Sequence, residues 1–499
     1  MKKYIYSSFL LMSLLLTSCD NFLSVESPDK LTTKKFWRDK KDAESAIAAA
    51  YSQLEYSVDT WAFAEVKWPV EAYREDIITL GNDAMNYPNW VELSTFSYTN
   101  GNSQVTEYWK NNYDGINFCN QILENVPKID KNKIDDASRA QILGEAHFLR
   151  AYYHLKLLLN WEKIVIRDKF IAGTQDLKKP VSERVACWDA IVSDLKQSLR
   201  LPARYDADNV GRATSGAAYS YLGFAYLTRA YEEKAKKEEY LGQALEAFEH
   251  VKGYELEEKF SSMFSGVNKN CKESVFELQF SMNTASGANY RTQFHKWIAS
   301  SELGGWDEIL PSQILISEFE KEGMISTQSL YDKRMYETLF FDTPFYNDGK
   351  KKVFGSDYKD KFGTSKRTVF RKMLPSTQQG MDQNYCAINI PLMRYANVML
   401  FKAEVLNALG RSAEAIPLIN EIRKVHGNMP PMKGSSPSEV MAQIEHERMI
   451  EFPLENWRWY DLRRWGKLTQ AMSAAKRSGF NESKNSFYPL PLKEVLANQ

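Results

Sequence analysis

The sequence is poor in cysteine and histidine and carries no excess of charge of either sign. Five cysteines and six histidines are spread over 499 residues, and 64 basic side chains balance 64 acidic ones. Because no CxxC pair and no histidine cluster accompany the cysteines, zinc and redox motifs are not supported. Without a basic surplus the chain lacks the phosphate-neutralising surface that nucleic-acid binding requires. We therefore expect no metal, no cofactor and no nucleic-acid partner.

Glycine and proline are also scarce, at 24 and 17 residues, and 43 % of the residues are hydrophobic, which is typical of a folded soluble protein. A chain of this length buries a substantial core, so its stability should need no disulfide staples. Beyond Cys19 four cysteines stand far apart, and we expect buried free thiols. An exported protein can also form one or two disulfides, whose pairing the sequence does not choose. These cysteines are Cys119, Cys187, Cys271 and Cys386.

Motifs of common enzyme classes are missing as well. The chain has no HExxH, GxSxG, Walker or GxGxxG pattern. His147 and His154 are seven residues apart and can share a helix face, but they lack further metal ligands. We interpret them and His446 as structural histidines. The carboxylate pair of a glycoside hydrolase leaves no spacing signature, so a glycan-degrading enzyme stays an alternative to a non-enzymatic protein.

The apolar run nearest the N-terminus indicates export. Two lysines precede a run from Phe9 to Leu16, as in a secretory signal peptide, and this run is too short to span a bilayer. It closes on Leu-Thr-Ser-Cys, which resembles the lipobox of bacterial lipoproteins. We predict that residues 1–18 are removed and that Cys19 is acylated. Acyl chains contribute about 0.8 kcal/mol per buried methylene, so lipid alone anchors the mature chain.

Apolar periodicity predicts a mostly α-helical protein. Steps of three and four residues between Asp42 and Leu54 place an apolar stripe on a first helix. The patterns at 109–126 and 137–161 predict a helical hairpin. The spacing of small and aromatic residues at 215–250 and 395–423 resembles tetratricopeptide helix pairs, with Gly410 as a helix stop. Helical pattern also covers 309–319 and the start of 438–467.

Two long segments lack a sustained period. The first covers about residues 56–102, and the second is a loop-rich insertion over about 251–393 with a strand-like run at Ser274–Phe280. Long irregular segments in compact proteins tend to be functional. We therefore predict a helical body of tetratricopeptide-like helix pairs, over about 42–250 and 394–467, with large loop-rich insertions and a minor β element.

Aromatic side chains are unusually frequent, with 12 Trp, 27 Tyr and 26 Phe. A sugar ring has apolar faces and hydroxyl edges, so a flat aromatic beside an amide, carboxylate or guanidinium satisfies both. Such sets occur in the two irregular segments. Packing explains most single aromatics, but we expect at least one of the group to contact ligand. The candidate ligand-binding residues are Arg74, Asp76, Tyr87, Trp90, Asn283, Tyr290, Arg291 and Trp297, and the weaker ones are Trp61, Trp68 and Trp306.

The Arg- and Trp-rich stretch from Trp457 to Trp465 has a different interpretation. Guanidinium planes stack on aromatic faces and bridge carboxylates such as Glu451 and Asp461, which would lock the last helix to the body. We interpret this stretch as architecture and not as a ligand site.

Three stretches together resemble the SusD/RagB family of outer-membrane nutrient-binding lipoproteins. Their order and spacing cover the whole chain, although Pro453 and Asn456 depart from the family pattern. Asn tolerates left-handed backbone, so the local turn should survive. The stretches are 19–23 with Pro28 and 36–51, then 144–153 with 211–214, and finally 447–466 with 488–491 and Asn498.

This resemblance implies a single SusD-like domain over residues 19–499. It also implies a non-catalytic lipoprotein of the outer membrane, facing the cell exterior, that captures an oligosaccharide or polysaccharide through loop aromatics. The partner it implies is a SusC-like TonB-dependent transporter. A peptide-binding member of the family and a protein-binding repeat scaffold remain alternatives, beside the glycan-degrading enzyme.

Overall fold

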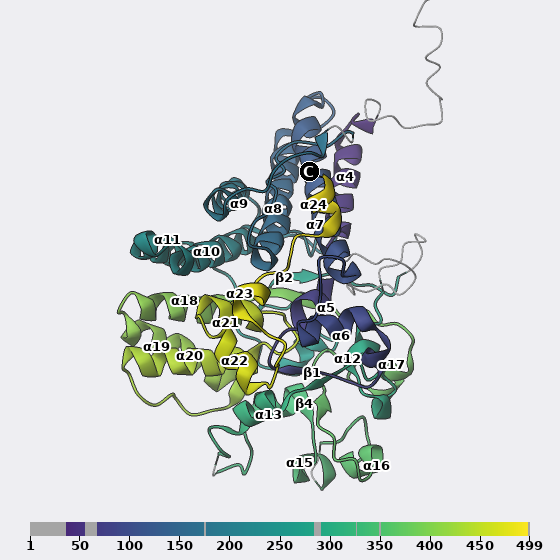
Figure 1. Cartoon of the computed structure of the whole chain (residues 1–499), viewed down its shortest axis with the longest axis vertical. Helices are drawn as coiled ribbons and strands as arrows, with labels where there is room; N and C mark the ends of the chain where they lie inside the picture. The colour runs from purple at the N-terminus through teal and green to yellow at the C-terminus, as the bar shows by residue number, and fades with distance from the viewer. Residues whose placement is uncertain are drawn as a thin grey trace, which may run out of the picture.

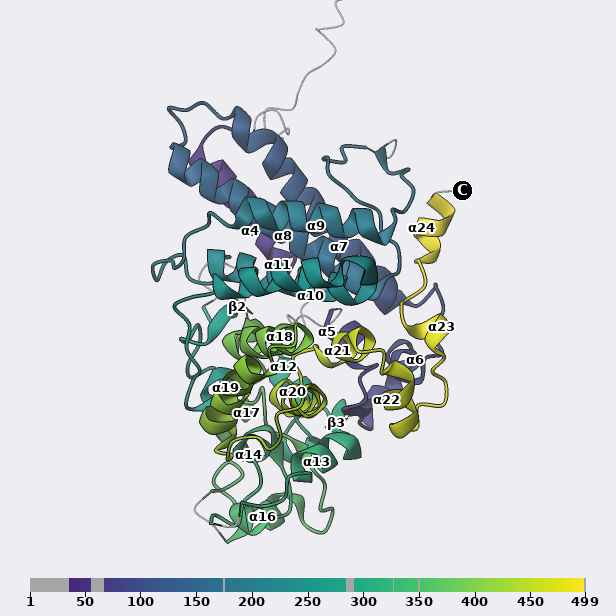
Figure 2. The same ribbon diagram turned by 90° about the vertical axis from the view of Figure 1, so that its left-hand side faces the viewer.

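The computed structural model describes residues 36–54, 67–173, 176–283, 291–325, 327–348 and 351–497. It is mostly α-helical with three small antiparallel strand pairs, as predicted. Figures 1 and 2 show long helices stacked at one end of the molecule and shorter elements at the other. The long helices of the stack are α4 (Lys40–Ser52), α7 (Ser103–Asn125), α8 (Asp136–Asn160), α9 (Arg184–Ser198), α10 (Ser215–Glu232) and α11 (Lys237–Glu249).

The rest of the chain forms a second helical group and a set of short elements. The second group consists of α18 (Tyr395–Ala408), α19 (Ser412–Ile422), α20 (Pro437–Glu451), α21 (Arg458–Arg464) and α22 (Leu468–Ala474). The short helices are α5 (Lys67–Ala72), α6 (Pro88–Thr95), α12 (Phe294–Ile298), α13 (Gln313–Glu320), α14 (Lys333–Thr338), α15 (Pro344–Asn347), α16 (Tyr358–Phe362), α17 (Gln378–Asp382), α23 (Glu482–Asn485) and α24 (Leu492–Ala497). The strands are β1 (Ile78–Leu80), β2 (Ser274–Leu278), β3 (Ile309–Pro311), β4 (Leu339–Phe340), β5 (Val369–Phe370) and β6 (Ile390–Arg394).

Local capping explains where several of these helices begin. The side chain of Asp135 accepts a hydrogen bond from the backbone N–H of Ser138 at the start of α8. Helix α20 begins with a capping box between Ser436 and Glu439, and Pro437 occupies its first turn. These side chains satisfy backbone N–H groups that have no partner inside the helix, so the chain enters each helix at a defined residue.

The predicted helix pairs are confirmed. Helices α7 and α8 pack against each other, as do α10 with α11 and α18 with α19. In the α10–α11 pair, a Cβ on Gly223 would lie 2.5 Å from the ring of Phe248, which is why a small residue faces an aromatic one there. Gly410 follows α18 with a φ of +75°, so it stops that helix as expected.

Two strand pairs tie the irregular segments together. β2 pairs with β6, which confirms the strand-like run at 274–280. β1 pairs with β3, so the first irregular segment lies beside the second. The helical pattern predicted from residue 309 is wrong at its start, because residues 309–311 form β3 and the helix begins at Gln313. Backbone pairing with β1 outweighs the local periodicity there.

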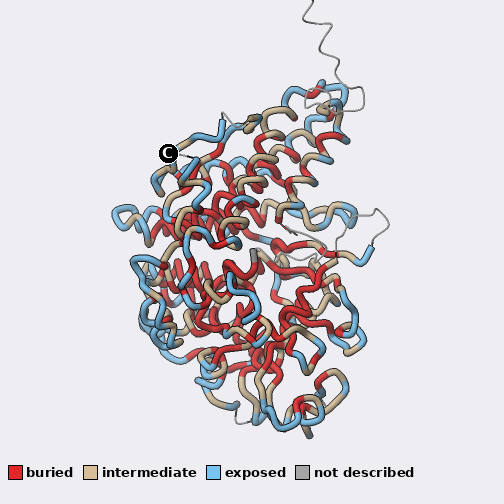
Figure 3. Tube along the Cα trace, turned by 45° about the vertical axis from the view of Figure 1, so that its right-hand side comes forward, coloured by how far each residue is buried: buried red, intermediate tan, exposed pale blue. Residues whose placement is uncertain are grey.

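Buried residues run through both ends of the molecule and through its middle (Figure 3). Most of the Arg- and Trp-rich stretch belongs to this interior, which agrees with the predicted architectural role of Trp459 and Arg464, whereas Arg463 is only half-buried. Arg464 pairs with Glu404 of α18 at 2.7 Å and with Asp461 at 2.9 Å, and Asp461 also receives Arg448 of α20 at 2.7 Å. These pairs lock α21 onto the second helical group.

The turn before α21 also agrees with its prediction. Asn456 has a φ of +61°, so the departure from the family pattern leaves the left-handed turn in place. Leu454, two residues earlier, is left-handed as well, with a φ of +68°. Cys119, Cys187 and Cys386 are buried free thiols, whereas Cys271 is a free thiol that is only half-buried. Within the described residues no helix is long and apolar enough to cross a membrane.

Candidate aromatic ligand site

The first irregular segment presents two aromatic rings at the start of α6. Tyr87 precedes the helix, Pro88 occupies its first position, and Trp90 follows one turn later. Proline fixes φ near the helical value, so this short helix begins at a defined place. The rings of Tyr87 and Trp90 lie 4.1 Å apart between centroids. Tyr87 is 43 % exposed whereas Trp90 is 5 % exposed, so the outer ring rests on an inner one.

The second irregular segment meets the first at these rings. Trp297 of α12 lies 4.4 Å from Trp90 between ring centroids and is 2 % exposed. Trp306 lies 6.4 Å from Trp297 and is half-buried, and Tyr73 lies beneath, 6.4 Å from Trp90. We call Tyr87, Trp90, Trp297 and Trp306 the aromatic cluster. Two predicted segments about 200 residues apart in the sequence therefore supply one continuous group of rings, of which Tyr87 is the most exposed.

Helix α12 is held in place by a buried lysine. The Lys296 ammonium donates to the carbonyl oxygen of Gly304 at 3.0 Å and to that of Met381 at the end of α17. Burial lowers the pKa of Lys296 below its ordinary value, and burial also lowers the pKa of His295 to about 4. The His295 ring is hence neutral near pH 7, and these two side chains anchor the helix that carries Trp297.

A cation and another ring lie just before α12. The guanidinium carbon of Arg291 is 3.9 Å from the ring centroid of Tyr385. Backbone hydrogen bonds between Thr292 and Cys386, of 2.8 and 2.7 Å, bring the two segments together. Arg291 and Tyr385 are both half-buried, so part of each remains accessible. Tyr385 was not a predicted candidate, because only this bridge places it beside Arg291.

Arg74 and Asp76 are buried and engaged with the C-terminal segment. The Arg74 guanidinium lies 4.5 Å from the ring centroid of Trp459 and 4.6 Å from that of Tyr488. Asp76 accepts two hydrogen bonds from Arg458, at 2.9 and 2.8 Å. The structure therefore does not bring these two side chains to the exposed face of the aromatic cluster.

The other predicted positions have separate surroundings. Asn283 is exposed, and its backbone N–H donates to the hydroxyl of Ser281 at 3.1 Å. Trp68 is buried beneath Tyr73, with its ring centroid 6.0 Å away. Cys19, Trp61 and Tyr290 lie outside the described residues.

The histidines singled out from the sequence have structural partners. A ring nitrogen of His147 lies 2.7 Å from the Asp194 carboxylate, and one of His446 lies 2.7 Å from that of Glu318. His154 is buried, receives the backbone N–H of Arg167 at 3.2 Å, and has its pKa lowered to about 4 by burial. The interpretation of these histidines as structural residues agrees with this geometry.

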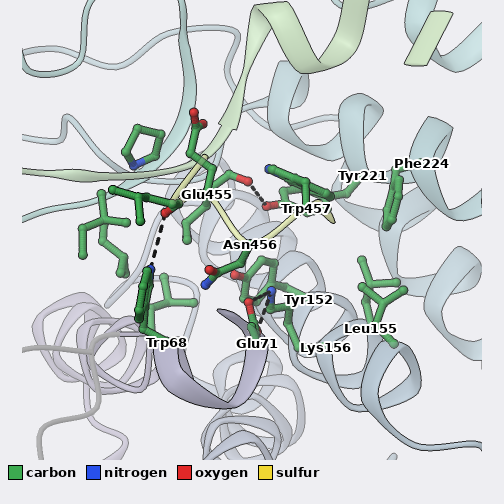
Figure 4. Close-up of a pocket in the computed structure, with 17 residues that line it drawn as sticks. Trp68, Glu71, Tyr152, Leu155, Lys156, Tyr221, Phe224, Glu455, Asn456 and Trp457 are labelled. Carbon is green, nitrogen blue, oxygen red and sulfur yellow. Dashed lines mark hydrogen bonds and ion pairs between the residues drawn. The ribbon is translucent and has the colours of Figure 1, made fainter. Parts of the chain in front are cut away.

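A hollow lies between the long-helix stack and the loop before α21 (Figure 4). Trp68, Tyr152 and Trp457 contribute rings to its wall, and Lys156 pairs with Glu71 at 2.7 Å beside Asn456. Its free volume is about 60 Å³, which holds two waters at about 30 Å³ each but not a sugar ring. The aromatic cluster is therefore the better candidate for an oligomeric ligand.

Comparison with known families and structures gives a consistent answer. Residues 272–490 match the SusD family, and residues 21–227 match the family described as starch-binding associating with outer membrane. The SusD-like protein P2 of Formosa agariphila is 24 % identical over the whole chain and 98 % of its own length.

Two solved structures extend the comparison to the fold. A SusD superfamily protein from Bacteroides vulgatus superposes with a TM-score of 0.80 at 24 % identity, covering 93 % of this chain and 98 % of that one. Surface glycan-binding protein A from Bacteroides thetaiotaomicron, in complex with laminarihexaose, has a TM-score of 0.72 at 19 % identity, covering 92 % and 97 %. The helical architecture described above is thus shared with these proteins.

Proposed function

Because this chain belongs to the SusD/RagB family, we propose that it is a non-catalytic outer-membrane lipoprotein that captures an oligosaccharide for a SusC-like TonB-dependent transporter. The observation that carries the ligand assignment is the convergence of Tyr87 and Trp90 with Trp297. Two observations support a glycan ligand. A protein of the same fold was solved in complex with laminarihexaose, and the ring of Tyr87 is exposed where these side chains meet.

The contacts at the aromatic cluster divide between apolar faces and polar edges. Tyr87 offers its exposed ring to the apolar face of a sugar, and it rests on Trp90, which Trp297 contacts in turn. We propose that Arg291, beside Tyr385, contributes its guanidinium to the hydroxyl edges of the ligand. Asn283 stays a predicted ligand contact from the same segment, as does Tyr290, which lies outside the described residues. We assign Arg74 and Asp76 to the support of this segment and not to ligand contact, since both are buried.

Affinity electrophoresis of a soluble chain beginning at Asp20, against plant, host and microbial polysaccharides, tests the glycan assignment. We expect one polymer to retard the protein and Tyr87→Ala to weaken binding by about 0.5–1.5 kcal/mol, up to about tenfold in Kd. Tyr87→Phe keeps the ring and should bind normally. Met85→Ala is a matched control, because Met85 is 60 % exposed two residues away. Equal retardation of Tyr87→Ala and the parent chain would refute the site.

The same experiment distinguishes the alternatives. Retardation by no polymer, followed by binding of peptides, would replace the glycan with a peptide ligand. Release of reducing sugar that a single carboxylate mutation abolishes would identify a glycan-degrading enzyme. If Tyr87→Ala impairs folding and neither ligand class binds, a protein-binding scaffold is the better description.

Anchoring and partnership have their own tests. Cys19→Ala should move the full-length protein from the membrane fraction to the soluble fraction, and unchanged partitioning would refute lipid anchoring. Extraction in mild detergent should copurify a large β-barrel protein with the chain. Repeated failure to do so would count against the transporter partner.

A further inference from the structure

A pocket of about 350 Å³ lies between α10, α21, the end of α8 and residues 486–487. It shares no residue with the aromatic cluster, and its volume is within the range of about 300–1,000 Å³ of small-molecule sites. Figure 2 shows α10 and α21 facing the viewer on this side of the molecule. Its charged and aromatic lining includes Arg184, Tyr231, Glu232, Arg463, Arg464 and Phe487. We call it the arginine pocket.

The charge of Arg184 is already balanced. Its guanidinium donates to both carboxylate oxygens of Glu232, at 2.6 and 3.0 Å, and a third nitrogen donates to three backbone carbonyls. Glu232 also accepts a hydrogen bond from the indole N–H of Trp188 at 2.7 Å. The Glu232 carboxylate thus pairs closely with Arg184, and it also interacts electrostatically with Arg463.

Arg463, unlike Arg184, is not paired with a carboxylate of the described residues. Its Nη1 donates to the carbonyl oxygen of Leu159 at 2.5 Å, and its guanidinium carbon lies 4.4 Å from the ring centroid of Phe487. It forms no ion pair with the residues that the structure describes. Burial and the nearby Arg184 charge lower the pKa of Arg463 to about 9. Its Nε and Nη2 thus form a donor edge for which the described protein supplies no acceptor.

Arg464 also lines the pocket, but it is held by an acidic partner. Arg464 donates through Nε and Nη2 to Glu404 at 2.9 and 2.7 Å. Its Nη1 is buried and has no hydrogen-bond partner among the described residues. Arg184 and Arg464 are thus paired with Glu232 and Glu404, and Arg463 is the lining arginine whose donor edge lacks an acceptor among the described residues.

We propose that the arginine pocket binds a carboxylate-bearing small ligand of the size of an acidic monosaccharide, with the carboxylate on the Nε–Nη2 edge of Arg463. That edge presents two parallel N–H donors, which match the two oxygens of a carboxylate. The ring of Phe487 is also stacked by Arg184, whose guanidinium carbon lies 4.8 Å from the centroid, so the pocket has a fixed apolar wall for the body of the ligand. This site is separate from the proposed glycan site and does not depend on it.

Isothermal titration of glucuronate into the soluble mature chain tests the proposal, with glucose and sulfate as comparison ligands. We expect saturable glucuronate binding, no glucose binding and weaker sulfate binding. Arg463→Lys keeps the charge but loses the two-donor edge, and should weaken glucuronate on the order of tenfold or more. Arg200→Gln, which removes an exposed arginine outside the lining, should bind like the parent chain.

The outcomes separate this site from its rivals. Absence of saturable glucuronate binding to the parent chain overturns the proposal, whatever the variants do. Equal binding of sulfate and glucuronate overturns the carboxylate selectivity. Loss of glucuronate binding in Tyr87→Ala places the ligand at the aromatic cluster instead and also overturns it. If Arg463→Lys melts at a lower temperature, Phe487→Ala supplies the second test, since it removes the apolar wall and leaves the charge.

Discussion

Replacing Gly223 by alanine should destabilise the protein, although alanine is the better helix former. Gly223 lies inside α10, and an alanine Cβ would come within 2.5–2.7 Å of three ring carbons of Phe248. The ring is buried and stacks on Phe401 of α18, 6.1 Å away between centroids, so it has little room to retreat. Overpacking of a core costs about 1–3 kcal/mol.

Gly242 provides the matched control, because it lies in the partner helix α11 and has no atom within 4 Å of an added Cβ. Gly→Ala in a helix gains about 1 kcal/mol of intrinsic propensity. Gly242→Ala should therefore stabilise by about that amount, whereas at Gly223 the same gain is offset and the net effect is about 0–2 kcal/mol of destabilisation. The two variants should differ by about 1–3 kcal/mol in the free energy of unfolding.

Urea unfolding followed by circular dichroism and by tryptophan fluorescence measures this difference, provided that both probes give the same midpoint. The parent chain and the two variants are compared at one pH and one temperature. If Gly223→Ala stabilises the protein as much as Gly242→Ala does, the close helix contact is not rigid and the packing argument is refuted.

Two further predictions concern buried groups. The carboxylates of Glu451 and Glu273, each 3.0 Å from a ring nitrogen of His426, raise the pKa of His426 from 6.5 to about 9. Protonated His426 therefore stabilises the fold fully below pH 6.5, and this stabilisation is lost as pH rises through 9. The urea midpoint of the parent chain should fall across that range, and it should fall less in His426→Gln. An equal decline in both proteins would contradict the prediction. Burial raises the pKa of Cys187 and Cys386 to about 11, so a thiol reagent at pH 8 should modify them only after unfolding; rapid labelling of the native chain, resolved by peptide mapping, would contradict the burial.

Local patterns were sufficient for most of the helical architecture. Apolar spacing located the long helices because a helix that buries one face needs apolar residues at every third or fourth position. The stop at Gly410 and the left-handed turn at Asn456 were also predictable, since both depend on backbone conformations that few residues adopt. The strands β1 and β3 have three residues each, and such short runs carry no readable period.

The sequence indicated which residue types form the candidate site, but not which individual residues lie in it. Flat aromatics in irregular segments pointed to Tyr87, Trp90 and Trp297, yet nothing in the sequence states which ring faces solvent. A charged residue in a loop-like segment resembles a surface group. Arg74 and Asp76 are buried because partners from the C-terminal segment, and Asn160 of α8 at Arg74, enclose them.

The amino-acid sequence by itself indicated the helical class through apolar periodicity and the family resemblance through short ordered motifs, and it predicts a lipid attachment at Cys19. The tertiary structure alone decided that residues 87–90 and 297 form one cluster, that Tyr385 lies beside Arg291, and that Arg463 has a donor edge in a pocket. Each of these joins segments tens to hundreds of residues apart. Such contacts arise from packing of the whole chain, and they produce no regular residue spacing that could be recognised in the sequence.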